Sequence, residues 1–172
     1  LATAWKAASE GMSVTVIADP ARAEASRAAV GGLSFCPAEA VANGDEEMIE
    51  LSVAAKRDFP AFITSLEEAS GVSTRHRKWP TLMVARIDAD DALMDRVETA
   101  RNRIGFSSRR LSAAECRDAE HGLAEGIRSG LLLEDHDQVD SKSLTESLAA
   151  ACAASGVTVR AASVRASVQD AG

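Results

Sequence analysis

Residues 1–20 read LATAWKAASEGMSVTVIADP, and this stretch decides the fold class. It first predicts a helix that ends at Gly11, because glycine is the preferred residue just beyond a helix C-terminus. Ser13–Ile17 then predicts a buried strand that runs into Asp19 and Pro20. A helix followed by a buried strand and an acid is typical of the second half of a dinucleotide-binding βαβ unit.

The first half of such a unit is a strand and a GxGxxG turn, which seats a pyrophosphate at the helix N-terminus. Neither precedes Leu1, and the chain has no initiator Met. We therefore expect this chain to be a fragment of a longer protein whose first structural element lies upstream.

The composition is that of an ordinary globular protein. The chain has 172 residues, 46% of them hydrophobic and 26% charged, which suits one domain or two small lobes. A net charge of −7 and a pI near 5.0 argue against nucleic-acid and anionic-membrane partners, which need a basic face. No apolar run approaches the roughly 20 residues of a membrane helix. We expect a small-molecule partner, and the sequence leaves the oligomeric state open, a homo-oligomer included.

The cysteines Cys36, Cys116 and Cys152 are odd in number, widely spaced and without a CxxC pair. This pattern disfavours a disulfide framework and a zinc site, and it predicts a reducing, cytoplasmic location. We expect all three thiols to be buried and unreactive.

A long irregular stretch follows the first strand. Residues 21–43 are rich in Ala, Gly and Ser and predict a loop, whose small residues favour a functional role. A helix is predicted over residues 45–70 with Gly71 as its end, and Pro60 should kink it or split it in two.

The rest of the chain alternates strands and helices and gives a mixed α/β class. The predicted elements are a strand over 81–87, a helix capped by Asp88 that ends at Gly105, a short helix opened by the capping box Ser112–Glu115, a strand over 126–133, a helix capped by Asp140 that ends at Gly156, and one or two strands within 157–168.

Two features carry candidate binding chemistry. Asp19 stands about 20 residues beyond the expected glycine turn, where a carboxylate accepts the ribose hydroxyls of a dinucleotide; the alternative is a turn-forming Asp-Pro pair. In residues 25–33, small side chains let backbone N–H groups approach a phosphate or a flat ring, with Ser26 and Arg27 as further donors. The alternative for this run is a helical stub and a glycine turn.

No catalytic constellation is evident. We interpret His76, within a basic stretch, as part of a solvated turn, and His121 as a surface residue. His136 lies in the acidic run 134–137, for which a metal site is one interpretation and a solvated turn before the Asp140 cap is the preferred one. We assign no catalytic residue and no metal ligand.

Six runs keep the order and spacing of one known family: LATAW (1–5), SVTVI (13–17), AAVG (28–31), LEEASGV (66–72), LSAAEC (111–116) and DQVD (137–140). Through them, nearly the whole chain resembles the FAD-dependent amine and D-amino-acid oxidase superfamily, most closely the glycine oxidases of the thiamine pathway. The resemblance implies an α/β fold with an α+β insert, in which residues 1–37 and 140–172 are parts of a Rossmann-like FAD/NAD(P)-binding domain. Residues 38–139 would form an inserted helical and antiparallel-sheet substrate lobe.

The resemblance also implies roles for individual residues. Asp19, or the backbone at Ala18, would meet the adenosine ribose; Val164, or Arg165 beside it, would offer backbone groups to the adenine; and Ser34 would approach the substrate side. The positions that would line the pyrophosphate and flavin are Ala25, Ser26, Val30, Gly31 and Gly32.

Three positions depart from the family pattern. Gly32 stands where Met is usual, Pro80 where Gly is usual, and Ala18 where the ribose-binding acid is usual. These departures leave the expected fold intact and weaken the expectation of activity.

The activity implied is the oxidation of glycine, sarcosine or a small D-amino acid to an imine, with release of hydrogen peroxide. The substrate carboxylate is typically held by an Arg and aromatic hydroxyls, and this chain has no Tyr. We expect those groups to follow Gly172, and the 172 residues alone neither to hold FAD tightly nor to oxidise glycine. The alternatives are a nicotinamide-dependent oxidoreductase and a noncatalytic or decayed remnant of the fold.

Overall fold

The computed structural model describes residues 1–19, 25–34 and 38–162, and the chain divides into two compact units. Unit one contains Leu1–Val30, Ile63–Arg75 and Asp140–Gly172, and unit two contains Gly31–Phe62 and His76–Val139. Helices and strands alternate throughout, in agreement with the predicted mixed α/β class. The boundary between the units falls inside one helix, α4 (Glu46–Ser70).

The first helix of unit one, α1 (Ala2–Ser9), ends as the sequence predicts. Gly11 has a φ of +85°, a conformation that favours glycine. Its N–H donates to the carbonyl of Ala8, and the N–H of Met12 donates to the carbonyl of Ala7. This pair of hydrogen bonds is the Schellman motif, which pairs the last carbonyls of the helix.

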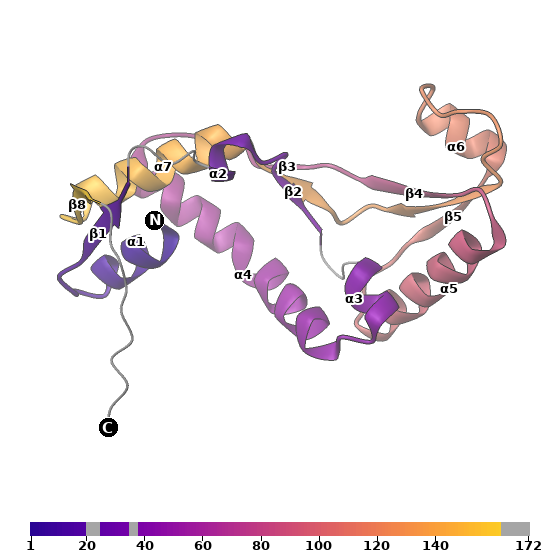
Figure 1. Cartoon of the computed structure of the whole chain (residues 1–172), viewed down its shortest axis with the longest axis horizontal. Coiled ribbons are helices and arrows are strands. Elements are labelled where there is room, and N and C mark those ends of the chain that lie inside the picture. The colour runs from indigo at the N-terminus through magenta and orange to yellow at the C-terminus, as the bar shows by residue number, and fades with distance from the viewer. Residues whose placement is uncertain (20–24, 35–37, 163–172) are drawn as a thin grey trace. The chain divides into compact units, whose positions relative to one another are not determined.

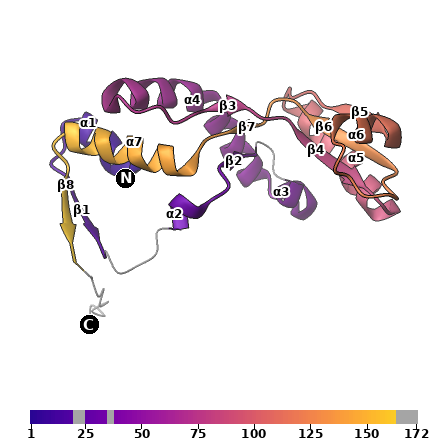
Figure 2. The same ribbon diagram turned by 90° about the horizontal axis from the view of Figure 1, so that it is seen from above.

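Two parallel strands follow the helices of unit one and lie side by side in Figure 2. β1 (Thr15–Ala18) pairs with β8 (Thr158–Ala161), with Thr15 opposite Thr158 and Ala18 opposite Ala161. A parallel pair brings the carboxyl ends of both strands to one edge. The residues at that edge are small: Ala18, Ala161 and Ala162. The N–H of Ala162 donates to the carbonyl of Ala18, which extends the pairing by one hydrogen bond.

The helical part of unit one centres on α7 (Ser141–Ala154), which lies against α1 (Figure 1). Asp140 caps α7 as predicted, with Oδ1 accepting from Ser143 N–H at 2.7 Å. At the other end Gly156 adopts a φ of +75°. The buried hydroxyl of Ser147 on α7 meets that of Ser70 at 2.7 Å, which fixes the end of α4 within this unit.

Unit two is built on an antiparallel sheet in the order β4-β6-β5. β4 (Thr81–Ala85), β6 (Ser129–Leu133) and β5 (Arg109–Ser112) are covered on one face by α5 (Asp88–Arg103), as Figure 1 shows. Met94 and Val97 of α5 pack with Leu131 in a fully buried cluster. The side chains of Leu111 and Cys116 form a second cluster with Ile127.

The helix α6 (Ala113–Ala119) confirms the predicted capping box: Ser112 Oγ accepts from Glu115 N–H, and Glu115 Oε2 accepts from Ser112 N–H at 2.8 Å. The prediction for α5 was wrong by one residue at its start. Asp88 is the first helical residue, and the carboxylate of Asp90 accepts from the N–H groups of Arg86 (2.8 Å) and Ile87 (3.1 Å). The carboxylate of Asp90 thus binds the two N–H groups that precede the helix, and Ile87, the residue at the cap position, makes no side-chain cap hydrogen bond.

A second sheet of unit two has very short strands in the order β2-β7-β3. They are β2 (Gly32–Leu33), β7 (Asp137–Gln138) and β3 (Arg77–Lys78), and both pairings are antiparallel. The stretch predicted as an irregular loop therefore contains β2, and it also contains the helices α2 (Ala25–Ala28) and α3 (Ala38–Asn43).

Pro60 does not split the long helix. It lacks an N–H and cannot donate to the carbonyl four residues earlier, yet α4 runs unbroken from Glu46 to Ser70 and ends at Gly71, with a φ of +68°. Buried side chains on both sides of the proline, Val53 before it and Ile63 after it, supply packing that two separate short helices would lose. The predicted long helix is confirmed, and of the two effects expected of Pro60, a kink or a split, the split does not occur.

Candidate functional site

Asp19 follows β1 directly, at the edge where the parallel strands end. Its side chain is half-buried, and its neighbour Ala18 is exposed. Ligands of open parallel sheets bind outside the carboxyl ends of the strands. Asp19 therefore lies at the edge of the strand pair where such ligands bind, and its contact with a ligand stays a prediction.

The small-residue run of unit one is held by α7. Ala25 and Ser26 open the short helix α2 and are exposed, and Val30 is 85% exposed. Arg27 forms an ion pair at 3.5 Å with Glu146 of α7, and Ser141 Oγ donates to the carbonyl of Ala29 at 2.7 Å. The hydroxyl at the start of α7 thus fixes the backbone just before the glycine pair.

The glycine pair and Ser34 lie in unit two. Gly31 has a φ of +78°, which favours glycine, and its carbonyl accepts from Val139 N–H at 2.9 Å. Gly32 has its backbone outside the left-handed region, and a Cβ built on it would meet no atom within 4 Å. The space that the usual side chain of this position would fill is open. Ser34 follows β2 and is exposed.

The residues predicted to contact the adenine, Val164 or Arg165, lie outside the described residues. So does Cys36, which was predicted to be buried. The predicted residues therefore fall into two groups, one in each unit: Asp19, Ala25, Ser26 and Val30 in unit one, and Gly31, Gly32 and Ser34 in unit two.

Unit two contains a buried charged cluster that the sequence did not predict. Lys56 Nζ donates to Asp137 Oδ2 at 2.8 Å and to the Asp135 carbonyl at 2.7 Å. His76 Nε2 lies 3.2 Å from the same Asp137 oxygen, and the ring of Phe59 meets the imidazole edge-on at 5.4 Å. His76 is thus half-buried beside a carboxylate, and its interpretation as part of a solvated turn was wrong.

The environment of Asp137 favours its charged form. Burial by itself raises the pKa of this carboxyl, but hydrogen bonding and charge from Lys56 and His76 outweigh it and hold the pKa below the usual aspartate value. Asp137 therefore keeps its charge to a lower pH than an ordinary aspartate does.

The lowered pKa predicts a loss of stability in acid. An unfolded chain binds a proton at Asp137 at a higher pH than the folded chain does, so the stabilisation is complete above the unfolded pKa of about 4 and is lost as pH falls through the folded value. We expect the unfolding free energy of Asp137→Asn, measured by urea denaturation over a pH series, to fall less steeply below about pH 4 than that of the unchanged chain.

Asp118→Asn is the matched control for this prediction, because Asp118 is exposed on α6. It should keep the slope of the unchanged chain. Equal acid slopes for Asp137→Asn and the unchanged chain would contradict the assignment.

The acidic run before α7 is a solvated turn only in its first half. Glu134 and Asp135 form a turn, and the Glu134 side chain is exposed. Asp135 forms an ion pair with Arg101, which is fully buried on α5. His136, by contrast, is 4% exposed, and its Nδ1 lies 3.0 Å from Thr81 Oγ1. Distant segments bury His136 and Asp137, and for these two residues the interpretation as a solvated turn was wrong. In the described ranges no set of three His, Cys, Asp or Glu side chains could hold a metal ion.

The two described cysteines are buried free thiols, as predicted. Desolvation raises the pKa of both Cys116 and Cys152, so neither supplies a thiolate for nucleophilic chemistry. His121 is exposed, as predicted, in the turn that follows α6, and its Nδ1 lies 2.9 Å from the carbonyl of Arg117 in that helix.

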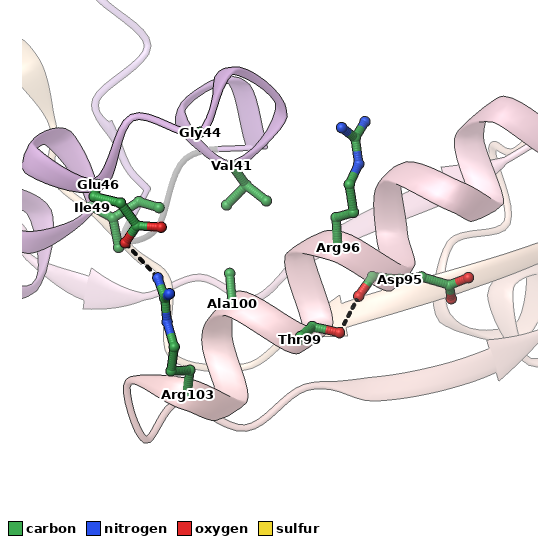
Figure 3. A pocket seen from close by; sticks show the side chains of 9 residues that line it. All are labelled: Val41, Gly44, Glu46, Ile49, Asp95, Arg96, Thr99, Ala100 and Arg103. Carbon is green, nitrogen blue, oxygen red and sulfur yellow. Dashed lines mark hydrogen bonds and ion pairs between the residues drawn. The ribbon is translucent and has the colours of Figure 1, made fainter.

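A groove of about 360 Å³ lies between α5 and the α3–α4 connection (Figure 3). Val41, Ile49 and Ala100 supply its apolar lining. Arg103 donates to Glu46 at 2.5 Å, and Thr99 Oγ1 donates to the Asp95 carbonyl at 2.8 Å, the two dashed contacts of Figure 3. Because these polar groups pair with one another, the groove gathers no acid–base pair for catalysis.

Sequence reasoning missed the supports of the candidate site. Val139 and Ser141 hold the backbone of Gly31 and Ala29 across more than a hundred residues. Lys56 and Asp137 are 81 positions apart.

The profile of one family, described as FAD dependent oxidoreductase (DAO), matches residues 1–172. No curated protein sequence matches the chain. Among the described residues, no helix combines the length and apolar character that crossing a membrane requires.

Solved structures show the same fold. Glycine oxidase from Geobacillus kaustophilus is similar with a TM-score of 0.78 and 21% identity, over 93% of this chain and 43% of that one. Glycine oxidase from Bacillus cereus ATCC 14579 gives 0.77 and 22% over 93% and 42%. Iminodiacetate oxidase from Chelativorans sp. BNC1 gives 0.74 and 18% over 93% and 43%. The chain spans less than half the length of these structures.

Proposed function

The chain belongs to the DAO family of FAD-dependent oxidoreductases, and from that membership we propose that it is part of an oxidase that converts glycine or a small amine or D-amino acid to an imine. The observation that carries the proposal is the parallel β1–β8 pair, whose carboxyl edge is lined by small residues and flanked by Asp19. Such an edge is where dinucleotide cofactors bind in open α/β sheets.

The residues present suit FAD. Asp19 offers a carboxylate for the ribose hydroxyls, and Ser26 offers a hydroxyl donor. Gly32 leaves open space where a Cβ would stand, so its backbone is free to approach a flat ring. We propose that Asp19, Ala25, Ser26 and Val30 hold the adenosine and pyrophosphate side, and that Gly31 and Gly32 face the flavin.

Bound FAD would supply the two-electron chemistry, in which the substrate loses a hydride from its α-carbon and a proton from its nitrogen, and oxygen takes up two electrons and two protons to leave as hydrogen peroxide. The protein orients the substrate and excludes competing reactions. Ser34, exposed after β2, is the residue of this chain that we place on the substrate side.

Glycine oxidases and an iminodiacetate oxidase are among the structures similar to this chain, and the substrates of these enzymes support a small amine or amino acid as the substrate here. The family membership supports the flavin and gives no support to the nicotinamide alternative. The charge of −7 supports the absence of nucleic-acid and anionic-membrane partners. A cytoplasmic location and a role in thiamine biosynthesis remain predictions.

The cofactor assignment is tested by titration. We expect the 172-residue chain to purify without stoichiometric flavin, because it spans only 43% of the glycine oxidase from Geobacillus kaustophilus. Added FAD should nevertheless bind weakly, so that its fluorescence is quenched in a saturable way. NADH should give no such response. Asp19→Asn should raise the dissociation constant about tenfold, the usual effect of losing a charge-assisted hydrogen bond.

Asp118→Asn, an equal change of charge on exposed α6, is the control and should leave FAD affinity unchanged. Equal responses to FAD and NADH, or none to either, would sink the proposal. Peroxide release on addition of glycine, sarcosine or D-alanine, assayed in the product of the complete reading frame, separates an oxidase from a noncatalytic remnant.

A further inference from the structure

The buried charged cluster of unit two is attached to the strand that holds the glycine pair. Asp137, whose side chain is 4% exposed, lies in β7 and receives Lys56 of α4 (2.8 Å) and His76 (3.2 Å) on one oxygen, Oδ2. The side chains of Lys56 and His76 are themselves only 17% and 22% exposed. One carboxylate oxygen therefore ties α4 and the segment before β3 to β7.

Among the described residues, β2 pairs with β7 alone, because β7 is the central strand of the sheet β2-β7-β3. Leu33 lies opposite Asp137 and Gly32 opposite Gln138, and the carbonyl of Gly31 accepts from Val139 N–H at 2.9 Å. The backbone of residues 31–33 thus takes its position from residues 137–139.

Strands of two residues form few ladder hydrogen bonds, and segments with few such bonds open easily. The side chain of Asp137 adds contacts with Lys56 and His76 to the few backbone hydrogen bonds that hold β7. Its Oδ1 is buried without a hydrogen-bond partner among the described residues, so the contacts of Oδ2 with the Lys56 ammonium and the His76 imidazole must offset the burial of the whole carboxylate. Lys56 also donates to the Asp135 carbonyl at 2.7 Å, which fixes the chain just before β7.

We propose that Lys56, His76 and Asp137 form a positioning cluster that fixes β7 and, through β7, holds the backbone of residues 31–33 in the conformation that receives the flavin. The inference rests on the proposed function, which assigns Gly31 and Gly32 to the cofactor. The three side chains act through the backbone of β7 and are positioning residues, not catalytic ones.

Hydrogen–deuterium exchange on the 172-residue chain tests the positioning step without the cofactor. In Lys56→Met, the amides of Val139 and residues 31–33 should exchange about tenfold faster or more, since loss of the partner of a buried charge exceeds the free energy of a tenfold change. The amides of β4, β6 and α5 should keep their protection. His76→Gln, a milder change, should show a smaller increase at the same amides.

The matched control is Glu46→Gln, which removes a charge and an ion pair from the same helix but at an exposed site. It should leave the exchange of residues 31–33 unchanged. FAD titration of the same variants gives the second readout: the dissociation constant should rise with Lys56→Met and His76→Gln and stay constant with Glu46→Gln.

Unchanged exchange at residues 31–33 in both Lys56→Met and His76→Gln overturns the inference, whether or not FAD binds. Faster exchange with unchanged FAD affinity also overturns it, because the held backbone then does not serve the flavin. If the unchanged chain does not quench FAD fluorescence, the proposed function is rejected. The exchange data still decide, without FAD, whether the cluster positions residues 31–33.

Discussion

Gly130→Ala is expected to lower the free energy of unfolding by about 1–3 kcal/mol, the usual cost of forcing a methyl group into a packed core. A Cβ built on Gly130 in β6 would lie 2.5 Å from Cys116 Sγ and 3.0 Å from both the Leu82 side chain and the Met83 carbonyl oxygen. Cys116 is fully buried and Met83 O belongs to the backbone, so neither yields readily. Urea denaturation measures the loss.

Gly32→Ala is the matched control. It is the same substitution in another strand of unit two, but its Cβ meets nothing within 4 Å, so the change should stay within about 0.5 kcal/mol. In Cys116→Ala/Gly130→Ala the closest contact is gone, and the double variant should lose less than the sum of the single losses. Equal losses at Gly130 and Gly32 would show that the β6 contact is not restrictive.

Arg101→Met is expected to cost about 3 kcal/mol, the lower end of the range for breaking a buried ion pair. Arg101 is fully buried, and its Nη2 donates to the Ser107 carbonyl at 3.0 Å and to the Asp135 carboxylate. Methionine keeps much of the apolar stem but leaves Asp135, 23% exposed, without this cation. The partial exposure of Asp135 is why the lower end applies.

Arg103→Met separates burial from charge. Arg103 lies on the same helix and also forms an ion pair, but it and Glu46 are each 58% exposed, so its loss should cost no more than about 1 kcal/mol. Arg101→Met/Asp135→Asn should recover part of the stability lost in Arg101→Met, since no uncompensated carboxylate remains. Similar costs for Arg101→Met and Arg103→Met would contradict the importance of burial.

The elements that the sequence predicted well have ends marked by local chemistry. Helices end at Gly11, Gly71, Gly105 and Gly156, and each has a positive φ. The Ser112–Glu115 capping box and the Asp140 cap form within three residues. A backbone donor and its cap are neighbours in sequence, so a short stretch is enough to predict them.

The predictions that failed depended on distant segments. His76, His136 and Asp137 were interpreted as solvated because they are polar, but Asp137 lies against Lys56 and His76, and His136 lies against Thr81. Pro60 was expected to kink or split a helix that runs unbroken from Glu46 to Ser70. Burial is a property of what the rest of the chain places nearby, and no local pattern records it.

By itself, the sequence determined the class of fold, the family, the cofactor of that family and the ends of most helices, because each follows from residue types in a fixed order or from contacts within a turn. Only the tertiary structure decided how the glycine pair is supported: by Val139 N–H, by the two-residue strand β7, and by a buried carboxylate held between Lys56 and His76. Those partners lie tens to more than a hundred positions apart, and their attraction is strong only because folding removes them from water.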